Sequence, residues 1–176
     1  MSSIKESNSE YKFNILTSNL VLWNHNINDQ NWNLDSYKQI GIYKTVEDFW
    51  IYSNELTNKL INYGMFFLMK EGIMPTWEDP QNMDGGCISI KLSLIEAIDL
   101  WKKISIYLVS GNFDDKINGI SISPKRNFNI IKIWVKEEID MNTYKLPCEF
   151  NLNNKIVLFR IHKTNIEKDR DKQKNN

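Results

Sequence analysis

Short stretches of the chain alternate between apolar and polar residues, which is the pattern of strands with one buried face. The turn residues Pro124-Lys125-Arg126-Asn127 separate two of these stretches and indicate a hairpin. The predicted strands are Leu16 to Trp23, Ile40 to Tyr43, Met65 to Met69, Cys87 to Leu92, Ile117 to Ser123, Asn129 to Val135 and Lys155 to His162.

Two longer segments carry apolar residues at helical spacing. The first starts at Thr45-Val46-Glu47-Asp48, which has the side chains of a capping box, and is predicted to reach about Asn62. The second starts at the capping box Ser93-Leu94-Ile95-Glu96 and is predicted to end near Ser110, before Gly111. Strands and two long helices in this order predict an α+β fold, with helices packed on one face of an antiparallel sheet.

The length of 176 residues suits one domain with a substantial core. Residues 1–12 are polar and without periodicity, so they are predicted to form a disordered tail. Residues 164–176 are charged and equally featureless, and are predicted to form a second flexible tail. The domain itself is predicted to occupy residues 13–163.

Composition narrows the class of protein. Lys+Arg and Asp+Glu both number 22, so no global basic field indicates nucleic-acid binding, and an anionic ligand would need a local basic patch. Cys87 and Cys148 belong to no C-x-x-C motif, which favours a reducing compartment over a disulfide scaffold. The N-terminus has no apolar signal segment, and the run from Met65 to Met69 is too short to cross a bilayer. We therefore expect a soluble, cytoplasmic, monomeric protein without a membrane partner.

Two tryptophans in polar surroundings, Trp32 and Trp77, are the most informative residues, and Glu78 follows the second directly. Two indoles can sandwich a purine while the carboxylate accepts protons from the Watson–Crick edge of guanine. A 7-methylated guanine is cationic, so stacking gains a cation–π energy of about 0.5–2 kcal/mol per face. Tryptophan is also a common core residue, so this trio alone is a weak signal.

Five motifs occur in an order that is recognisable as a whole. They are Thr45-Val46-Glu47-Asp48-Phe49-Trp50, Gly72-Ile73-Met74-Pro75-Thr76-Trp77-Glu78-Asp79, Gly85-Gly86, Gly111-Asn112-Phe113-Asp114-Asp115 and Ile131-Lys132-Ile133-Trp134. On these motifs the chain resembles the translation initiation factor 4E family, the eukaryotic mRNA cap-binding proteins, from about Ile15 to His162. The resemblance implies a curved antiparallel sheet with helices on the convex face and the cap on the concave face.

The resemblance also implies roles for individual residues. Trp32 and Trp77 match the two indoles that stack on the cap base, and Glu78 matches the carboxylate that accepts from guanine N1–H and N2–H₂. Trp134 matches the indole near the methyl group of the base. Base recognition is therefore expected to be intact.

The cap phosphates are expected to meet fewer basic residues than is usual in the family. Lys125, with Arg126 beside it, matches the basic position that pairs with the cap phosphates. The family's basic residue after Gly-Gly is Cys87 in this chain, and Ile130 stands where a second lysine is expected, although Lys132 or Arg126 would partly substitute.

The back of the sheet is expected to bind a protein. Val46 and Trp50 match the exposed pair that docks a helical motif of the scaffold subunit and of its competing repressors. Phe49 and Trp50 point about 100° apart on a helix, so both cannot lie at the centre of one apolar stripe, and one must face outward. On the second helix Ile106 keeps the apolar anchor, whereas Lys102-Lys103 replaces a Leu-Glu pair, so the partner surface is altered.

The sequence thus predicts a cap-binding adaptor that needs no catalytic residue, metal or cofactor, and that bridges capped mRNA to a scaffold. A cap-binding repressor that does not engage the ordinary scaffold stays open. A nucleotide-hydrolysing or nucleotide-modifying enzyme is a rival, but its nearest acidic cluster, Glu137-Glu138, lacks companions. A carbohydrate-binding module is a further alternative. His25, Cys87 and His162 lack suitably spaced partners and are assigned neither metal binding nor catalysis.

Overall fold

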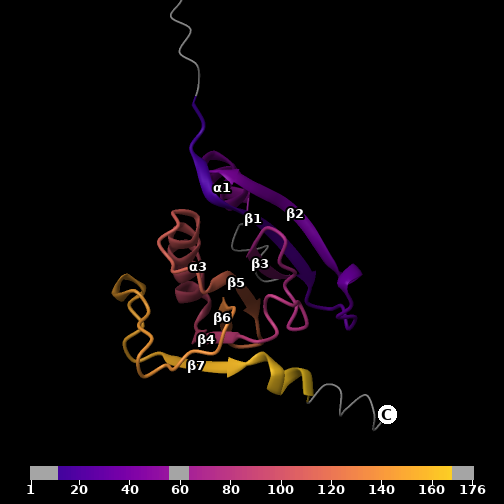
Figure 1. Ribbon diagram of the computed structural model, residues 1–176, viewed down its shortest axis with the longest axis vertical. Helices are drawn as coiled ribbons and strands as arrows, with labels where there is room; N and C mark the ends of the chain where they lie inside the picture. The colour runs from indigo at the N-terminus through magenta and orange to yellow at the C-terminus, as the bar shows by residue number, and fades with distance from the viewer. Residues whose placement is uncertain (1–11, 56–63, 168–176) are drawn as a thin grey trace, which may run out of the picture.

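The computed structural model describes residues 12–55 and 64–167. Its centre is a curved antiparallel sheet with the strand order β2-β1-β3-β5-β6-β4-β7, and α1 and α3 lie on one side of it (Figure 1). The elements are β1 (Ile15–Asn26), η1 (Leu34–Ser36), β2 (Tyr37–Thr45), α1 (Val46–Glu55), β3 (Gly64–Lys70), β4 (Gly86–Leu92), α3 (Leu94–Val109), β5 (Ile117–Pro124), β6 (Asn129–Val135), η2 (Cys148–Phe150) and β7 (Ile156–Ile161).

The convex face of the sheet forms the main core with the helices. Ile88, Ile120 and Ile133 of the central strands are 0% exposed, and they share one cluster with Ala97 and Ile104 of α3. Burying each aliphatic side chain contributes about 1.5–3 kcal/mol. This face therefore supplies most of the apolar burial that holds α3 on the sheet.

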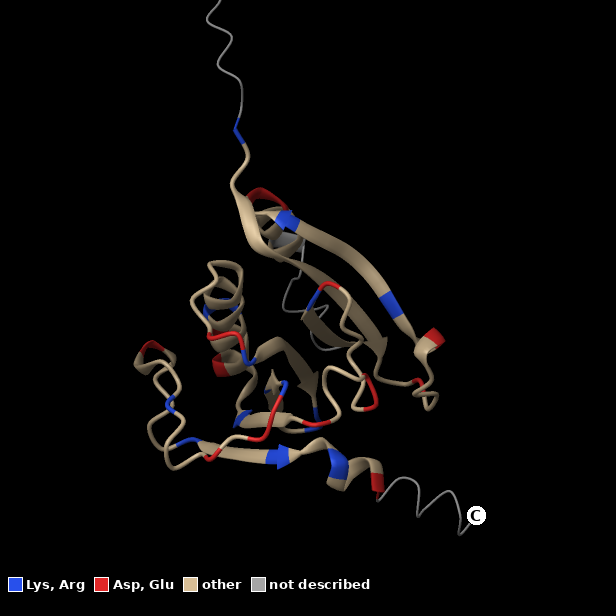
Figure 2. Cartoon of the chain, in the orientation of Figure 1, with Lys and Arg blue, Asp and Glu red and all other residues tan. Residues whose placement is uncertain are grey.

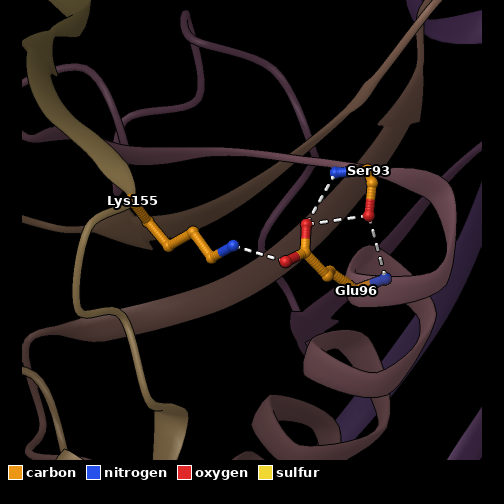
Figure 3. Close-up of polar contacts among 3 residues, drawn as sticks. All are labelled: Ser93, Glu96 and Lys155. Carbon is orange, nitrogen blue, oxygen red and sulfur yellow. Dashed lines mark hydrogen bonds and ion pairs between the residues drawn. The ribbon is translucent and has the colours of Figure 1, made fainter.

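Helix α3 begins as the sequence predicts. The Glu96 carboxylate accepts from the Ser93 backbone N–H at 3.1 Å and from its hydroxyl at 2.7 Å, while the Ser93 hydroxyl accepts from the Glu96 N–H (Figure 3). Lys155 forms an ion pair with the same carboxylate, which ties the approach to β7 to the start of α3. These contacts, led by the Lys155 hydrogen bond, hold the pKa of Glu96 at about 2.

Helix α1 is capped in the same way. The Thr45 hydroxyl accepts from the Asp48 N–H at 3.1 Å, and the Asp48 carboxylate accepts from the backbone N–H groups of Lys44 and Thr45 at 2.9 Å each. The hydrogen bonds to Asp48, that of Lys44 first, lower its pKa. The reciprocal bonds satisfy donors that would otherwise be free at the helix start.

The α+β fold and the predicted strands are confirmed, with β2 starting three residues earlier than expected. The first helix is confirmed from Val46 to Glu55, and its predicted continuation to Asn62 lies outside the described residues. Residues 162–167 are helical and Ile166 is buried, so ordered chain continues past the predicted boundary at residue 163. In the described residues, no helix combines the length and apolarity required to cross a membrane.

The Gly85-Gly86 pair allows β4 to enter the sheet between β6 and β7. A Cβ on Gly85 would lie 1.8 Å from the Val135 carbonyl oxygen, and one on Gly86 would lie 2.4 Å from the Arg160 carbonyl oxygen. Backbone atoms cannot yield as a flexible side chain can, so any larger residue would push the strands apart. The pair therefore fixes where the preceding loop joins the sheet.

Candidate ligand site on the concave face

The concave face is built from the strand residues that alternate with those of the main core. Residues paired across neighbouring strands share a face, and the register joins Trp23 to Phe67 and Trp134 to Cys87. Phe67, Cys87 and Trp134 belong to a second apolar cluster, and Trp23 and Trp77 pack against it. This face is therefore aromatic where the convex face is aliphatic.

The loop between β3 and β4 holds Trp77 over this face. The Asp79 carboxylate accepts from the backbone N–H of Met74 and of Gln81 at 2.8 Å each, which closes the loop on itself. The buried Asn82 donates to the carbonyls of Met74 and Thr76 at 2.9 Å each. Asp79 therefore shapes the loop that presents Trp77 and Glu78.

Trp32 lies on the loop that follows β1, where it stacks on His25. The two ring centroids are 4.1 Å apart and the planes differ by 5°. Side-chain oxygens of Asn26, Asp29 and Asn31 accept from backbone N–H groups two residues later, which gives this polar loop its shape. Trp32 is 53% exposed although one of its ring faces is covered by His25, so the residue is still available to a ligand.

Tyr37 lies between the two tryptophan loops. Its ring is 5.1 Å from that of His25 and 5.6 Å from that of Phe67. Burial, and next the negative charge of Glu78, raises the pKa of Tyr37 to about 12. The carboxylate of Glu78 therefore acts on the same part of the concave face that Trp32 and His25 border.

Trp134 lies at the bottom of the concave face. It is 2% exposed, and its indole N–H donates to the Ser121 hydroxyl at 3.0 Å. Its predicted contact with a ligand methyl group stays a prediction. Trp101 is buried in the main core, whereas Trp23 packs against the second cluster on the concave side.

A buried pair, Cys87 and His162, lies beside Trp134 at the edge of the site. The imidazole donates from Nδ1 to the Asn82 carbonyl at 2.8 Å, so Nε2 is the acceptor for the Cys87 thiol at 3.1 Å. Burial raises the pKa of Cys87 to about 12 and lowers the pKa of His162 to about 4. Both groups are therefore neutral near pH 7, unlike the thiolate and imidazolium of a nucleophilic pair.

Positive charge reaches the site from β6 and from the turn before it. The ammonium of Lys132 lies 5.8 Å from the centroid of the Trp77 ring. Lys125 and Arg126 are exposed on the β5–β6 turn, where the Lys125 N–H donates to the Phe128 carbonyl. Ile130 shares the face of Lys132, two residues along the same strand, and leaves that position uncharged.

The convex side carries an exposed apolar surface on its helices. Phe49 is 4% exposed and Trp50 is 50% exposed, which confirms that only one of them faces outward. Ile106 on α3 is 45% exposed, and Lys102 and Lys103 lie four and three residues before it, hence on the same helix face. The other predicted contact residue is the half-buried Val46, which packs against the main core.

Sequence reasoning did not identify the roles of three residues that shape the concave site, His25, Tyr37 and His162, or the position of Lys132 against Trp77. The signal for His25 and Lys132 was strand alternation, since His25 and Trp23 share a face and so do Lys132 and Trp134. Tyr37 precedes the predicted start of its strand at Ile40. His162 gave no such signal, because its partners Cys87 and Asn82 are 75 and 80 residues away in the chain.

A helix-backed curved antiparallel sheet places this chain in the α+β class, with a candidate ligand site on its aromatic concave face. The model of the family "Eukaryotic initiation factor 4E" matches residues 15–176, and the chain belongs to this family. A rice protein, "Eukaryotic translation initiation factor NCBP", is 33% identical over 110 residues, which are 60% of this chain and 48% of the relative. The match thus spans about half the length of that relative.

Two solved structures have the same fold. "Complex of C. elegans eIF4E-3 with the 4E-binding protein Mextli and cap analog" is 21% identical with a TM-score of 0.74, covering 89% of this chain and 96% of that one. "Complex crystal structure of Ascaris suum eIF4E-3 with m2,2,7G cap" is 22% identical with a TM-score of 0.65, covering 80% and 79%. At this identity the likeness concerns the fold.

Proposed function

We propose that the chain binds the 7-methylguanosine cap of mRNA between Trp32 and Trp77 on the concave face. The observation that carries the proposal is the aromatic concave face, where Trp77 packs against the cluster that contains Phe67 and Trp134, and Trp32 is 53% exposed. Glu78 would accept from N1–H and N2–H₂ of the guanine. The Trp134 indole would lie below, toward the methyl group.

The proposed energetics favour the methylated base. Each indole stack would contribute about 1–3 kcal/mol, and the positive charge of 7-methylguanine adds a cation–π energy of about 0.5–2 kcal/mol per ring face. His25 supports Trp32 from behind, so the indole is largely placed before the ligand arrives. Such preorganisation reduces the entropic cost of binding.

The cap phosphates would meet Lys125 and Arg126 on the β5–β6 turn. Both side chains are exposed, so their attraction is screened by salt. A Lys125→Ala variant should therefore lose more cap affinity at low salt than at high salt. Equal losses at both salt concentrations would remove Lys125 from the phosphate site.

On the convex side, the chain would bind a helical motif of a scaffold initiation factor through Val46, Trp50 and Ile106. Exposed tryptophan is a frequent hot spot for a helix that docks into an apolar surface. Lys102 and Lys103 would favour a motif with acidic residues. The solved nematode complex contains a 4E-binding protein, which is consistent with such a partner.

Matched tryptophan variants test the cap proposal. Trp77→Ala should abolish retention on a cap-analogue resin, whereas Trp50→Ala, which removes an equally large side chain from the convex side, should leave retention unchanged. Tryptophan quenching should rank 7-methyl-GTP far above GTP in the unaltered protein. Unchanged retention of the Trp77→Ala variant, with its fold confirmed by circular dichroism, would reject the site.

Two alternative functions have distinct readouts. A cap-binding repressor would be retained on the cap-analogue resin but would fail to capture scaffold-derived helical peptides. A nucleotide-processing enzyme would convert the cap analogue on prolonged incubation, whereas the binding proposal expects the intact ligand to be recovered.

A further inference from the structure

The seven strands differ sharply in charge from the rest of the chain. In the described residues, none of the strands contains Asp or Glu, although the whole chain has 22 acidic and 22 basic residues. Figure 2 shows the acidic positions on helices and connections rather than on the strand arrows. The sheet is thus the basic part of a neutral protein.

Three of the strand cations face the concave side, all on the half formed by β6, β4 and β7. Lys132 and Lys91 flank the position of Ser89, the first across the ladder and the second along β4. Arg160 of β7 is paired with Cys87, which belongs to the concave cluster. Lys91 and Lys132 are diagonal neighbours on adjacent strands, about 7–8 Å apart. Arg160 lies four residues along β7 from Ile156, the register partner of Lys91, so the three charges form an extended row across this half of the sheet.

These cations are not neutralised by local acids. In the part of the chain that the structure describes, no ion pair includes Lys91, Lys132 or Arg160. The ion pair nearest to them in sequence joins Asp84 to Lys163, just beyond β7, so the Asp84 carboxylate is already paired. The cations therefore remain available to an external anion.

Apolar side chains separate the charges. Ile156 and Leu158 of β7 are 58% and 48% exposed, and their register partners on β4 are Lys91 and Ser89. The Lys91 ammonium lies 4.3 Å from the centroid of the half-buried Phe128 ring. The surface offers positive charge beside two exposed aliphatic side chains and one aromatic ring, so it presents contacts for both the phosphates and the bases of a single strand.

We infer that this strip, defined as Lys91, Lys132, Ile156, Leu158 and Arg160, binds the first nucleotides of the RNA that follow the cap. The inference rests on the proposed function. The strip adjoins the cap site, because Lys132 lies 5.8 Å from the Trp77 ring. Phosphates would lie against Lys132, Lys91 and Arg160, and bases would lie on Ile156 and Leu158. An acidic protein segment could also pair with these cations, but it would not be attached to the cap. RNA is favoured because it continues directly from the cap site into the strip.

The test compares three ligands by fluorescence titration of the full chain: a cap dinucleotide, a capped unstructured RNA of eight nucleotides and the same RNA without its cap. The unaltered protein should bind the capped RNA about tenfold more tightly than the dinucleotide, because the cap holds the RNA at the strip at high effective concentration. Equal affinities for the dinucleotide and the capped RNA would overturn the inference.

Variants of the strip then test whether its residues cause the tighter binding of capped RNA relative to the dinucleotide. Lys91→Gln with Arg160→Gln should remove most of the gain and leave dinucleotide affinity unchanged, while the matched control Lys145→Gln, on an exposed connection, should change neither. Two lost phosphate contacts lower the salt slope by about 1.4, so raising salt fourfold should weaken the unaltered protein about sevenfold more than the variant. Leu158→Ser should reduce the gain with an unchanged salt slope. A full gain in the double variant would overturn the inference.

The uncapped RNA separates this inference from the cap proposal. If the dinucleotide does not bind, the cap proposal fails. The strip then stands only if uncapped RNA still binds with a salt slope that Lys91→Gln and Arg160→Gln reduce. Loss of uncapped RNA binding in the same protein would reject both.

Discussion

The two faces of the sheet use the same strands for different purposes. On β6, Ile133 faces the convex side and is 0% exposed in the aliphatic core, while the next residue along the chain in each direction, Lys132 and Trp134, faces the concave site. The convex face is aliphatic and closed by α3, and the concave face is aromatic, polar and partly open. Binding and stability should therefore respond to different substitutions, even at adjacent positions.

Neighbouring residues on β6 give the largest expected difference. Ile133→Ala should lower the free energy of unfolding by about 2–5 kcal/mol, because it leaves a cavity in the main core. Lys132→Gln, one residue earlier, should change it by less than about 0.5 kcal/mol. Denaturant unfolding of both variants measures this, and similar losses in the two would show that the faces are not energetically separate.

His162 is the place where the concave side should affect stability strongly. Its pKa is lowered to about 4 in the folded protein, mainly by burial, against an ordinary value of 6.5. The unfolded chain therefore binds a proton more readily as the pH falls below 6.5, and this destabilises the fold progressively down to pH 4. The cost should reach about 3 kcal/mol.

The measurement is denaturant unfolding at pH 7 and at pH 4, in the unaltered protein and in His162→Gln. The variant should lose less stability on acidification, by about 3 kcal/mol, because glutamine does not titrate. Carboxylates titrate in both proteins and cancel in the difference. The same loss in both proteins would mean that His162 accepts a proton within the fold at its ordinary pKa.

The exposed helices of the convex side should affect partner binding alone. Trp50→Ala should weaken a scaffold-derived helical peptide by about 2 kcal/mol or more, as expected for a hot spot, with cap affinity unchanged. Reversing Lys102 and Lys103 to glutamate should shift preference from acidic to basic peptides by roughly 1 kcal/mol per charge. Isothermal titration calorimetry with matched peptides measures both effects. A loss of cap affinity in the Trp50→Ala variant would contradict the prediction that the two sites are separate.

Much of the fold could be predicted from local signals. The two capping boxes located the starts of α1 and α3, and alternation located the strands, because each of these features depends on residues a few positions apart. Outward exposure of Trp50 also followed from helix geometry beside Phe49. The start of β2 at Tyr37 was missed, since Lys38, Gln39 and Ile40 face solvent and carry little alternation.

The concave site depended on contacts that the chain makes over longer distances. Trp32 could be proposed as a stacking residue, but its support by His25 requires the loop after β1 to fold back on the strand. The Cys87–His162 pair requires β4 and the end of β7 to lie together. Register and loop closure decide such contacts, and residue types alone do not specify them.

The smallest expected effect concerns the uncharged position in the phosphate region. Ile130 is half-buried on the concave side, opposite Ser123 of β5 and Lys91 of β4. Ile130→Lys would add a cation beside the proposed phosphate path, and should strengthen 7-methyl-GTP binding by roughly 1 kcal/mol at low salt, with a smaller gain at high salt. The control Ile130→Gln changes size and polarity without charge and should give no gain. The nucleoside 7-methylguanosine, which has no phosphate, should bind both variants as it binds the unaltered protein. A gain for the nucleoside would place the effect of the lysine at the base rather than at the phosphates, and would move the predicted phosphate path away from β6.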